Sequence, residues 1–220
     1  MMSNVTSQLL HIYDALIEHY GPQGWWPADS KTETIIGTIL VQHTAWKNVE
    51  RAMAKLKAEN LLDFRAIHDL EPTTLAKIIQ PAGTPTVKAR RLQAFAAWLG
   101  ARHGFKLDSM SATPPDLLRR ELLAINGVGP ETADCILLYA AEQAVFVVDT
   151  YTRRVLSRHF LADSNWGYDQ VKDLFEANLP RDVRLFNEFH ALLVEVGKRH
   201  CRKAPICANC PLDHLEHTAE

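Results

Sequence analysis

The sequence predicts an all-α fold, and three observations support this prediction. Apolar residues recur with the 3.6-residue spacing of an amphipathic helix along most of the chain. Clusters of Gly and Pro separate these apolar stripes and mark turns between helices. The segment Val145–Val148 alone has the composition of a strand, and a run of four residues cannot make a sheet.

The predicted helices follow one another from the N-terminus. The first carries an apolar stripe from Leu9 to Tyr20 and ends at Gly21-Pro22. Further stripes lie within Ile35–Leu40, Val49–Leu56, Leu92–Leu99, Leu117–Leu123 and Phe186–Val196. The breaks between them include Pro81–Gly83, Pro114-Pro115, Gly127–Pro130 and Pro180. We therefore expect a core that is built from helices alone.

Composition and charge narrow the class of protein. The chain has 220 residues, of which 47% are hydrophobic and 23% charged, as in an ordinary globular protein. Its formal net charge of −2 excludes a uniformly basic nucleic-acid binder. No apolar run approaches the ~18 residues of a membrane helix, and the first residues lack the basic start of a signal peptide. We therefore expect a cytoplasmic protein without a membrane partner.

The charge is distributed unevenly along the chain. Residues 72–107 contain six basic residues and no acidic residue. A locally basic face on a nearly neutral protein suits a polyanion partner. Solvated faces of helices would explain the same charges equally well, so charge alone leaves both interpretations open.

The most informative segment is LLRRELLAINGVGPETADCILLYAA, residues 117–141. An amphipathic helix runs into Gly127 and Gly129, and a second helix is expected to start at Pro130. The glycines permit a tight turn with bare N–H groups, which form an anion site at the helix start that suits a phosphate. A plain turn between two helices is the alternative interpretation.

An acidic residue follows this hairpin at a fixed place. Asp149 comes nineteen residues after Pro130, in VFVVDTYTRRV. The short apolar run brings its carboxylate to the start of another predicted helix, Tyr151–Phe160. Asp149 is therefore a candidate for chemistry, or simply the N-cap of that helix.

Five blocks, taken in order, resemble the endonuclease III superfamily of helix-hairpin-helix DNA glycosylases. They are ILVQHTAWKNVERA, PAGTPTVKARRL, INGVGPETAD, VVDTYTRRV, and HALLVEVGKRHC followed by PICANCPL. The resemblance implies two α-helical domains with a helix-hairpin-helix motif and a DNA-binding cleft between them. It assigns residues 23–143 to a six-helix barrel domain that carries the hairpin. Residues 1–22 and 144–220 would form the second helical domain, with the cysteine cluster at its C-terminal end.

The same resemblance places Asp149 and Glu131 at the catalytic site. Breaking the N-glycosidic bond builds positive charge on the sugar. An ionised Asp149 would stabilise that charge and orient or deprotonate a water. Bifunctional members carry a lysine nucleophile at the position of Glu131, and a carboxylate cannot form their imine intermediate. Glu131 therefore indicates a monofunctional enzyme, although it is also a favourable acid for the first turn of a helix.

DNA contacts are implied for six residues, namely Gln42, Lys88, Arg91, Gly127, Gly129 and Thr132. A glycosylase extrudes the target nucleotide, and Gln42 matches the family residue that fills the vacated space. Lys88 and Arg91 are expected to contact phosphates. The loop Gly83–Lys88 matches the family loop that probes the opposite strand, but its sequence departs from the usual pattern. Gln42 as a surface or capping residue is the alternative.

Three tryptophans suggest the base that is removed. Trp25, Trp26 and Trp46, together with Glu131, make the chain similar to the 3-methyladenine DNA glycosylase branch of the superfamily. An alkylated purine is electron-poor and cationic, so aromatic faces bind it by stacking and cation–π attraction. Tryptophans near Gly and Pro are also common as buried anchors. Oxidised or mismatched pyrimidines are the alternative substrates.

The last segment contains three cysteines, Cys201, Cys207 and Cys210, in a spacing typical of metal ligands. Members of the family commonly hold a [4Fe–4S] cluster with four cysteines, but the place of the fourth, about Glu216, is not cysteine here. The fourth ligand of a cluster would then be His214, His217 or Glu216. Alternatively, Cys210 and His214 close a Cys3His zinc site, or the cysteines bind nothing.

Taken together, the sequence predicts a base-excision-repair DNA glycosylase. It would act as a monomer on double-stranded DNA that contains a damaged base, in the nucleoid region of the cytoplasm. One alternative is a bifunctional glycosylase with abasic-site lyase activity on oxidised pyrimidines. Another is a non-catalytic DNA-binding module, against which Asp149 argues because gripping a phosphate backbone requires no acid there.

Overall fold

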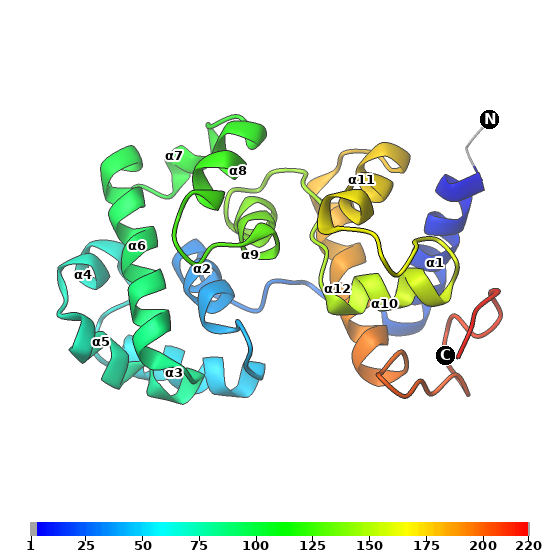
Figure 1. The fold of residues 1–220 in the computed structure, drawn as a ribbon, viewed down its shortest axis with the longest axis horizontal. Helices are drawn as coiled ribbons and strands as arrows, with labels where there is room; N and C mark the ends of the chain where they lie inside the picture. The colour runs from blue at the N-terminus through cyan, green and yellow to red at the C-terminus, as the bar shows by residue number, and fades with distance from the viewer. Residues whose placement is uncertain (1–3, 220) are drawn as a thin grey trace. The chain divides into compact units, whose positions relative to one another are not determined.

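The computed structural model describes residues 4–219. Within them it contains α-helices, one 3-10 turn and one π-helical turn, and no strand. The all-α prediction is confirmed (Figure 1). No helix in this part of the chain is both long and apolar enough to cross a membrane. The outermost residues of the predicted second domain, 1–3 and 220, lie outside the described part.

The chain divides into two compact units. We call Trp26–Gln143 the hairpin unit, and the segment up to Trp25 together with the segment from Ala144 the Asp149 unit. The hairpin unit contains α2 (Lys31–Leu40), α3 (Trp46–Ala58), α4 (Phe64–Asp69), α5 (Pro72–Ile78), η1 (Gln80–Ala82), α6 (Pro85–His103), α7 (Asp108–Ser111), α8 (Pro115–Leu123), α9 (Pro130–Cys135) and the π-helical turn η2 (Ile136–Ala140). The Asp149 unit contains α1 (Asn4–Tyr20), α10 (Thr150–Arg158), α11 (Tyr168–Asn178) and α12 (Val183–Arg199).

Helix α2 is the central element of the hairpin unit. Ser30 caps its start, because the Ser30 side chain accepts a hydrogen bond of 3.2 Å from the backbone N–H of Glu33. Every residue from Thr34 to Leu40 is buried, so the helix is covered on all sides. It packs against α3, α6, α9 and η2, while α6 also runs along α4 and α5 (Figure 1).

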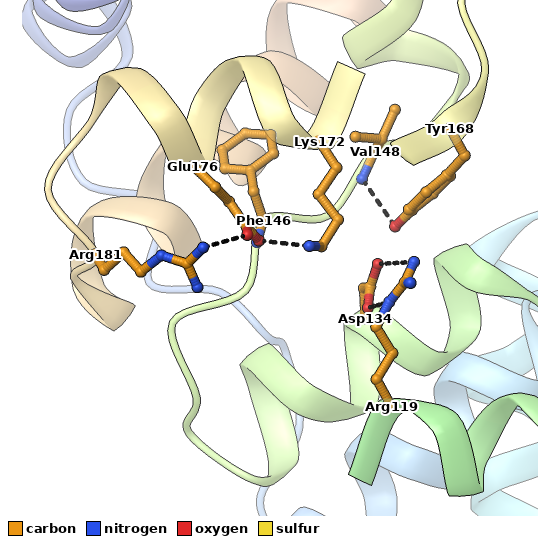
Figure 2. Close-up of polar contacts among 8 residues, drawn as sticks. All are labelled: Arg119, Asp134, Phe146, Val148, Tyr168, Lys172, Glu176 and Arg181. Atoms are coloured by element: carbon orange, nitrogen blue, oxygen red, sulfur yellow. Dashed lines mark hydrogen bonds and ion pairs between the residues drawn. The ribbon is translucent and has the colours of Figure 1, made fainter. Parts of the chain in front are cut away.

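The two helices that flank the Gly127–Pro130 turn are joined by an ion pair. Arg119 on α8 donates from Nε to Asp134 Oδ1 over 2.7 Å and from Nη2 to Asp134 Oδ2 over 3.1 Å (Figure 2). The Asp134 carboxylate on α9 is fully buried. Such a two-pronged contact fixes both position and orientation, so it holds α8 and α9 in a defined hairpin.

The Asp149 unit is built on α12, which packs against α10 and α1. Its core is aromatic. The rings of Phe146 and Phe175 stack with centroids 3.6 Å apart, and Phe186 and Phe189 meet them edge-on. Phe146, the only one of the four outside a helix, anchors the segment that leads to Asp149.

The segment Val145–Val148 is extended and buried but does not pair with another strand. Side chains of α11 satisfy part of its backbone instead. The N–H of Phe146 donates to Glu176 Oε1 over 2.9 Å, and the N–H of Val148 donates to the Tyr168 hydroxyl over 3.3 Å (Figure 2). Glu176 is held in turn by Lys172 at 2.9 Å and by Arg181 at 3.1 Å. These contacts let a strand-like sequence lie in the core without a sheet.

Candidate active site

The hairpin between α8 and α9 contains two glycines with different structural demands. Gly127 has a φ of 86°, and an added Cβ would lie 2.3 Å from Arg91 Cγ, so the fold itself requires glycine there. Gly129 has a φ of −93°, and an added Cβ would meet no atom within 4 Å. The fold therefore does not require a glycine at position 129, and its side faces open space.

Gln42, in the turn after α2, is bonded to this hairpin. Its Nε2 donates to Gly127 O over 3.1 Å and to Thr132 Oγ1 over 2.9 Å. Arg91 on α6 donates to Gln42 Oε1. The structure thus brings together four of the six predicted DNA-binding residues. Thr132 is itself buried, so its hydroxyl supports the hairpin rather than facing solvent.

Lys88 is buried, whereas a phosphate contact requires an exposed amine. Its side chain is 2% exposed, and Nζ donates to Ala82 O over 2.6 Å, which ties α6 to the 3-10 turn. Burial lowers the pKa of this amine, and the nearby Arg91 lowers it further. The DNA contact of Lys88 stays a prediction, and in this structure its amine binds the carbonyl of Ala82 instead. Its interior position depends on how η1 packs, which the local sequence does not reveal.

Asp149 is the N-cap of α10. Its Oδ1 accepts a hydrogen bond of 2.7 Å from the N–H of Thr152, and its backbone is extended as a cap requires. The other oxygen, Oδ2, lies 3.8 Å from Nε2 of His190 on α12. The Asp149 side chain is 13% exposed. One carboxylate oxygen is thus fixed by the helix, while the other faces an imidazole.

Local sequence does not indicate a role for His190, although this residue opens the block HALLVEVGKRHC. It is buried, and burial holds its pKa below the usual histidine value. The charge of Asp149 opposes this shift, and the charge of Lys198 adds to it. At neutral pH the ring is therefore neutral. The only sequence signal is a histidine within an otherwise apolar helix face.

The three tryptophans divide between the two units. Trp26 and Trp46 meet edge-on in the hairpin unit, with ring centroids 5.5 Å apart, and Tyr139 contacts Trp26 at 5.1 Å. Trp25 lies in the Asp149 unit, where its ring meets His190 edge-on at 5.7 Å and lies 5.4 Å from Lys198 Nζ. All three are half-buried. His190 therefore lies between Trp25 and Asp149 and contacts both.

Glu131 occupies the first turn of α9, and its side chain is exposed. An acid at this place interacts favourably with the positive end of the helix. Pro130 stands at the first helical position, where it needs no hydrogen-bond acceptor. Both residues adopt the positions that the sequence predicts for the start of the second hairpin helix.

The C-terminal cysteines line one pocket of the Asp149 unit. The pocket opens to solvent and is lined by Cys201, Cys207, Cys210, Arg158, Leu212 and His217 among others. Arg158 Nη1 donates to Cys201 Sγ over 3.2 Å. Burial raises the pKa of the Cys210 thiol, and the neighbouring Cys201 and Cys207 raise it further. Ionisation of Cys210 is therefore disfavoured by the two cysteines that share this pocket.

Comparison with known proteins identifies the family. Residues 36–181 match the HhH-GPD superfamily of base excision DNA repair proteins. The chain belongs to this superfamily. It is thereby placed among the DNA glycosylases of base excision repair. A protein of Methanocaldococcus jannaschii with the provisional name of DNA repair glycosylase is 44% identical over 214 residues, which span 96% of this chain and 97% of that protein.

Two solved structures of the same fold are similar to the chain at lower identity. A non-covalent complex of endonuclease III with DNA aligns with a TM-score of 0.81 and 22% identity, covering 98% of this chain and 95% of that one. The 3-methyladenine DNA glycosylase of Helicobacter pylori, bound to 1,N6-ethenoadenine, aligns with a TM-score of 0.76 and 24% identity, covering 89% and 97%. These likenesses confirm the helix-hairpin-helix glycosylase fold.

Proposed function

We propose that this chain is a monofunctional DNA glycosylase that removes an alkylated purine from double-stranded DNA and leaves an intact abasic site. The observation that carries the proposal is the environment of Asp149. One carboxylate oxygen is held by the start of α10, and the other faces neutral His190 at 3.8 Å. A carboxylate fixed in this way is ready to act on a reacting sugar.

The chemistry assigned to Asp149 follows from charge. As the bond between base and sugar breaks, positive charge develops on the sugar, and a fixed carboxylate stabilises it. The same carboxylate orients a water and accepts its proton as that water attacks C1′ of the sugar. The products are the free base and an abasic sugar, and no covalent bond to the protein forms.

The absence of a lysine at position 131 supports hydrolysis without strand cleavage. A lyase step needs an amine that attacks the sugar and forms an imine. Glu131 offers a carboxylate instead, exposed in the first turn of α9. We therefore assign Glu131 an electrostatic role at the helix start rather than a nucleophilic one.

Aromatic side chains support an alkylated purine as substrate. Trp26 and Trp46 offer half-buried π faces in the hairpin unit, and Trp25 offers one beside His190. Cationic bases are held by such faces through cation–π attraction, and their bonds to the sugar break readily. The 3-methyladenine DNA glycosylase of Helicobacter pylori, which has the same fold, was solved with bound 1,N6-ethenoadenine.

We assign the grip on DNA to the hairpin unit. A Cβ added at Gly129 would meet no atom within 4 Å, so a phosphate has room to approach the backbone there. Arg91 and Gln42 lie beside them. Gln42 stays the proposed residue that fills the space left by the extruded nucleotide, and it would have to exchange its bonds with Gly127 and Thr132 to do so.

We further propose that Cys201, Cys207 and Cys210 hold a [4Fe–4S] cluster. The three thiols line one pocket, and burial with the neighbouring Cys201 and Cys207 raises the pKa of the Cys210 thiol, a cost that a bound cation would offset. Bound there, a cluster would cross-link the C-terminal segment to α12 and supply a redox-active group. A single zinc ion is the alternative occupant.

A second candidate function is a bifunctional glycosylase with lyase activity. Lys198 favours it, because its amine lies over Trp25 and its charge reaches His190, the neighbour of Asp149. Borohydride reduction would trap an imine on this lysine, and Lys198→Gln would abolish that trapping.

The proposal is tested by product analysis on duplex DNA. Separate duplexes would carry an alkylated purine, an oxidised pyrimidine, a mismatch or no lesion. We expect base release from the alkylated purine, and strand breaks only after alkali treatment. Release from the oxidised pyrimidine alone would contradict the substrate assignment, and breaks without alkali would favour the second candidate.

A further inference from the structure

The pocket beside the end of α12 is lined by three cysteines and by the histidines His159, His200 and His217. We propose that His217 is the fourth ligand of the metal centre in this pocket, which gives a cluster bound by Cys201, Cys207, Cys210 and His217. This inference rests on the proposed binding of a cluster. It does not depend on which base the enzyme removes.

The tautomer of His217 points to a ligand. Its Nδ1 lies 2.8 Å from Leu215 O, and a carbonyl only accepts hydrogen bonds, so Nδ1 carries the proton. In the neutral ring Nε2 then carries the free lone pair. A histidine that donates one ring N–H to a backbone carbonyl while the other nitrogen binds metal is the usual arrangement at metal sites.

The position of His217 agrees with this role. A ring nitrogen of His217, Cys207 Sγ and a carboxylate oxygen of Asp213 lie within 4.8 Å of one another. Both side chains line the pocket, and that of His217 is 21% exposed whereas that of Asp213 is 52% exposed. Thiolates and imidazoles suit iron–sulfur clusters, while carboxylates suit harder cations. His217 is therefore the better fourth ligand of the two.

His217 is the one candidate raised by the sequence for the fourth position that lines the pocket, since His214 and Glu216 are both exposed and neither lines it. The histidines His159 and His200 also line the pocket, but His217 is the one grouped within 4.8 Å of Cys207 and Asp213 among the described residues. Glu216 presents its backbone carbonyl to His159 instead, at 3.1 Å. A zinc site closed by Cys210 and His214, one of the alternatives raised by the sequence, is not supported by this geometry.

The spread of the ligands favours a cluster over one zinc ion. Zinc binds sulfur at about 2.3 Å and nitrogen at about 2.0 Å, so its ligand atoms lie close together. Among the described residues, the compact group around Cys207 and His217 includes neither Cys201 nor Cys210. All four nevertheless line the same pocket, as the ligands of a larger, polynuclear centre would.

Arg158 completes the environment of the ligands. It is 9% exposed, donates to Cys201 Sγ, and is held by the carbonyls of Arg202 and Lys203 at 2.7 and 3.1 Å. A hydrogen bond to a ligand sulfur and a neutral imidazole in place of a thiolate both favour the reduced, more negative state of a cluster. The centre should therefore be reduced more easily than one with four thiolates.

The test measures the metal centre of the whole chain, purified without oxygen, by iron and sulfide content, visible absorbance, electron paramagnetic resonance and midpoint potential. The variants are His217→Ala and His217→Cys, and His214→Ala is the matched control three residues away on the exposed side. We expect about four iron atoms per chain in the unmodified protein and in His214→Ala. We expect His217→Ala to lose iron and give the resonance of a three-iron cluster. His217→Cys should retain full iron content with a more negative midpoint potential.

Each alternative outcome contradicts the inference. Unchanged iron content, spectrum and potential in both His217 variants would show that another group completes the centre. One zinc ion per chain, or no metal after reconstitution with iron and sulfide, would exclude the cluster itself. If His217→Ala fails to fold by circular dichroism, the potential of His217→Cys decides alone. Base release is assayed separately, so loss of the cluster proposal and loss of the glycosylase proposal are distinguishable.

Discussion

Oδ2 of Asp149, at the start of α10, lies 3.8 Å from Nε2 of His190 on α12. Oδ1 is bonded to the N–H of Thr152, and this hydrogen bond orients the carboxylate. His190 is buried and neutral, so it lies beside Oδ2 without neutralising the charge of Asp149. An ionised, oriented carboxylate is the feature that the proposed hydrolysis requires.

The buried histidine makes stability depend on pH. Burial holds the pKa of His190 below its usual value. In the unfolded chain His190 is protonated below about pH 6.5, whereas in the folded protein it stays neutral to lower pH. The free energy of unfolding should therefore fall as pH drops from 7.5 to 5.5. We expect His190→Gln to reduce this fall, as measured by urea unfolding at both pH values. His11→Gln, at an exposed position of α1, is the control, and equal pH dependence in both variants would contradict the account.

Loss of the ion pair between α8 and α9 should strongly reduce the free energy of unfolding. Arg119→Met removes the cationic side chain that pairs with the fully buried carboxylate of Asp134. Removal of one member of such a pair costs about 3–5 kcal/mol of unfolding free energy. The neighbouring Arg120 is exposed, so Arg120→Met should change stability by less than about 0.5 kcal/mol. Equal unfolding midpoints for the two variants in urea would refute this reading of the pair.

The two hairpin glycines should respond differently to alanine. Gly127→Ala places a Cβ at positive φ and against Arg91, so it should lower the free energy of unfolding by about 1–2 kcal/mol or more. Gly129→Ala meets no protein atom and should fold normally. If a phosphate approaches the backbone there, Gly129→Ala should nevertheless weaken binding to duplex DNA in a titration. Undiminished affinity of Gly129→Ala would argue against a phosphate at this site.

Position 131 should decide whether the enzyme forms an imine. Glu131→Lys supplies an amine in the first turn of α9, at the place where bifunctional members carry their nucleophile. We expect borohydride to trap this variant on damaged DNA, and to trap neither the unmodified protein nor Glu131→Gln. Trapping of the unmodified protein would move the assignment to a lyase, with Lys198 as the amine to test first.

Local patterns in the sequence were sufficient for the fold class, the hairpin and the cap at Asp149. Each of these depends on residues a few positions apart, such as the Gly127–Pro130 turn or the hydrogen bond from Thr152 to Asp149. The strand-like run Val145–Val148 was too short to predict a sheet, and in the structure side chains of α11 satisfy part of its backbone.

Contacts between residues that are far apart in the sequence could not be predicted from local patterns. The burial of Lys88 depends on how the 3-10 turn packs beneath α6. His190 becomes a neighbour of Asp149 only because α12 packs on α10. Trp25 and Trp26 are adjacent in the sequence, and nothing local indicates that they belong to different units.

The most direct test of the account is base release by Asp149→Asn on duplex DNA with an alkylated purine, compared with the unmodified protein. The substitution keeps the shape of the side chain and an oxygen that can still cap α10, but it removes the charge. We expect the single-turnover rate to fall by about 100- to 10 000-fold while the affinity for the same duplex is retained. An unchanged rate would contradict the assignment of Asp149 as the catalytic carboxylate.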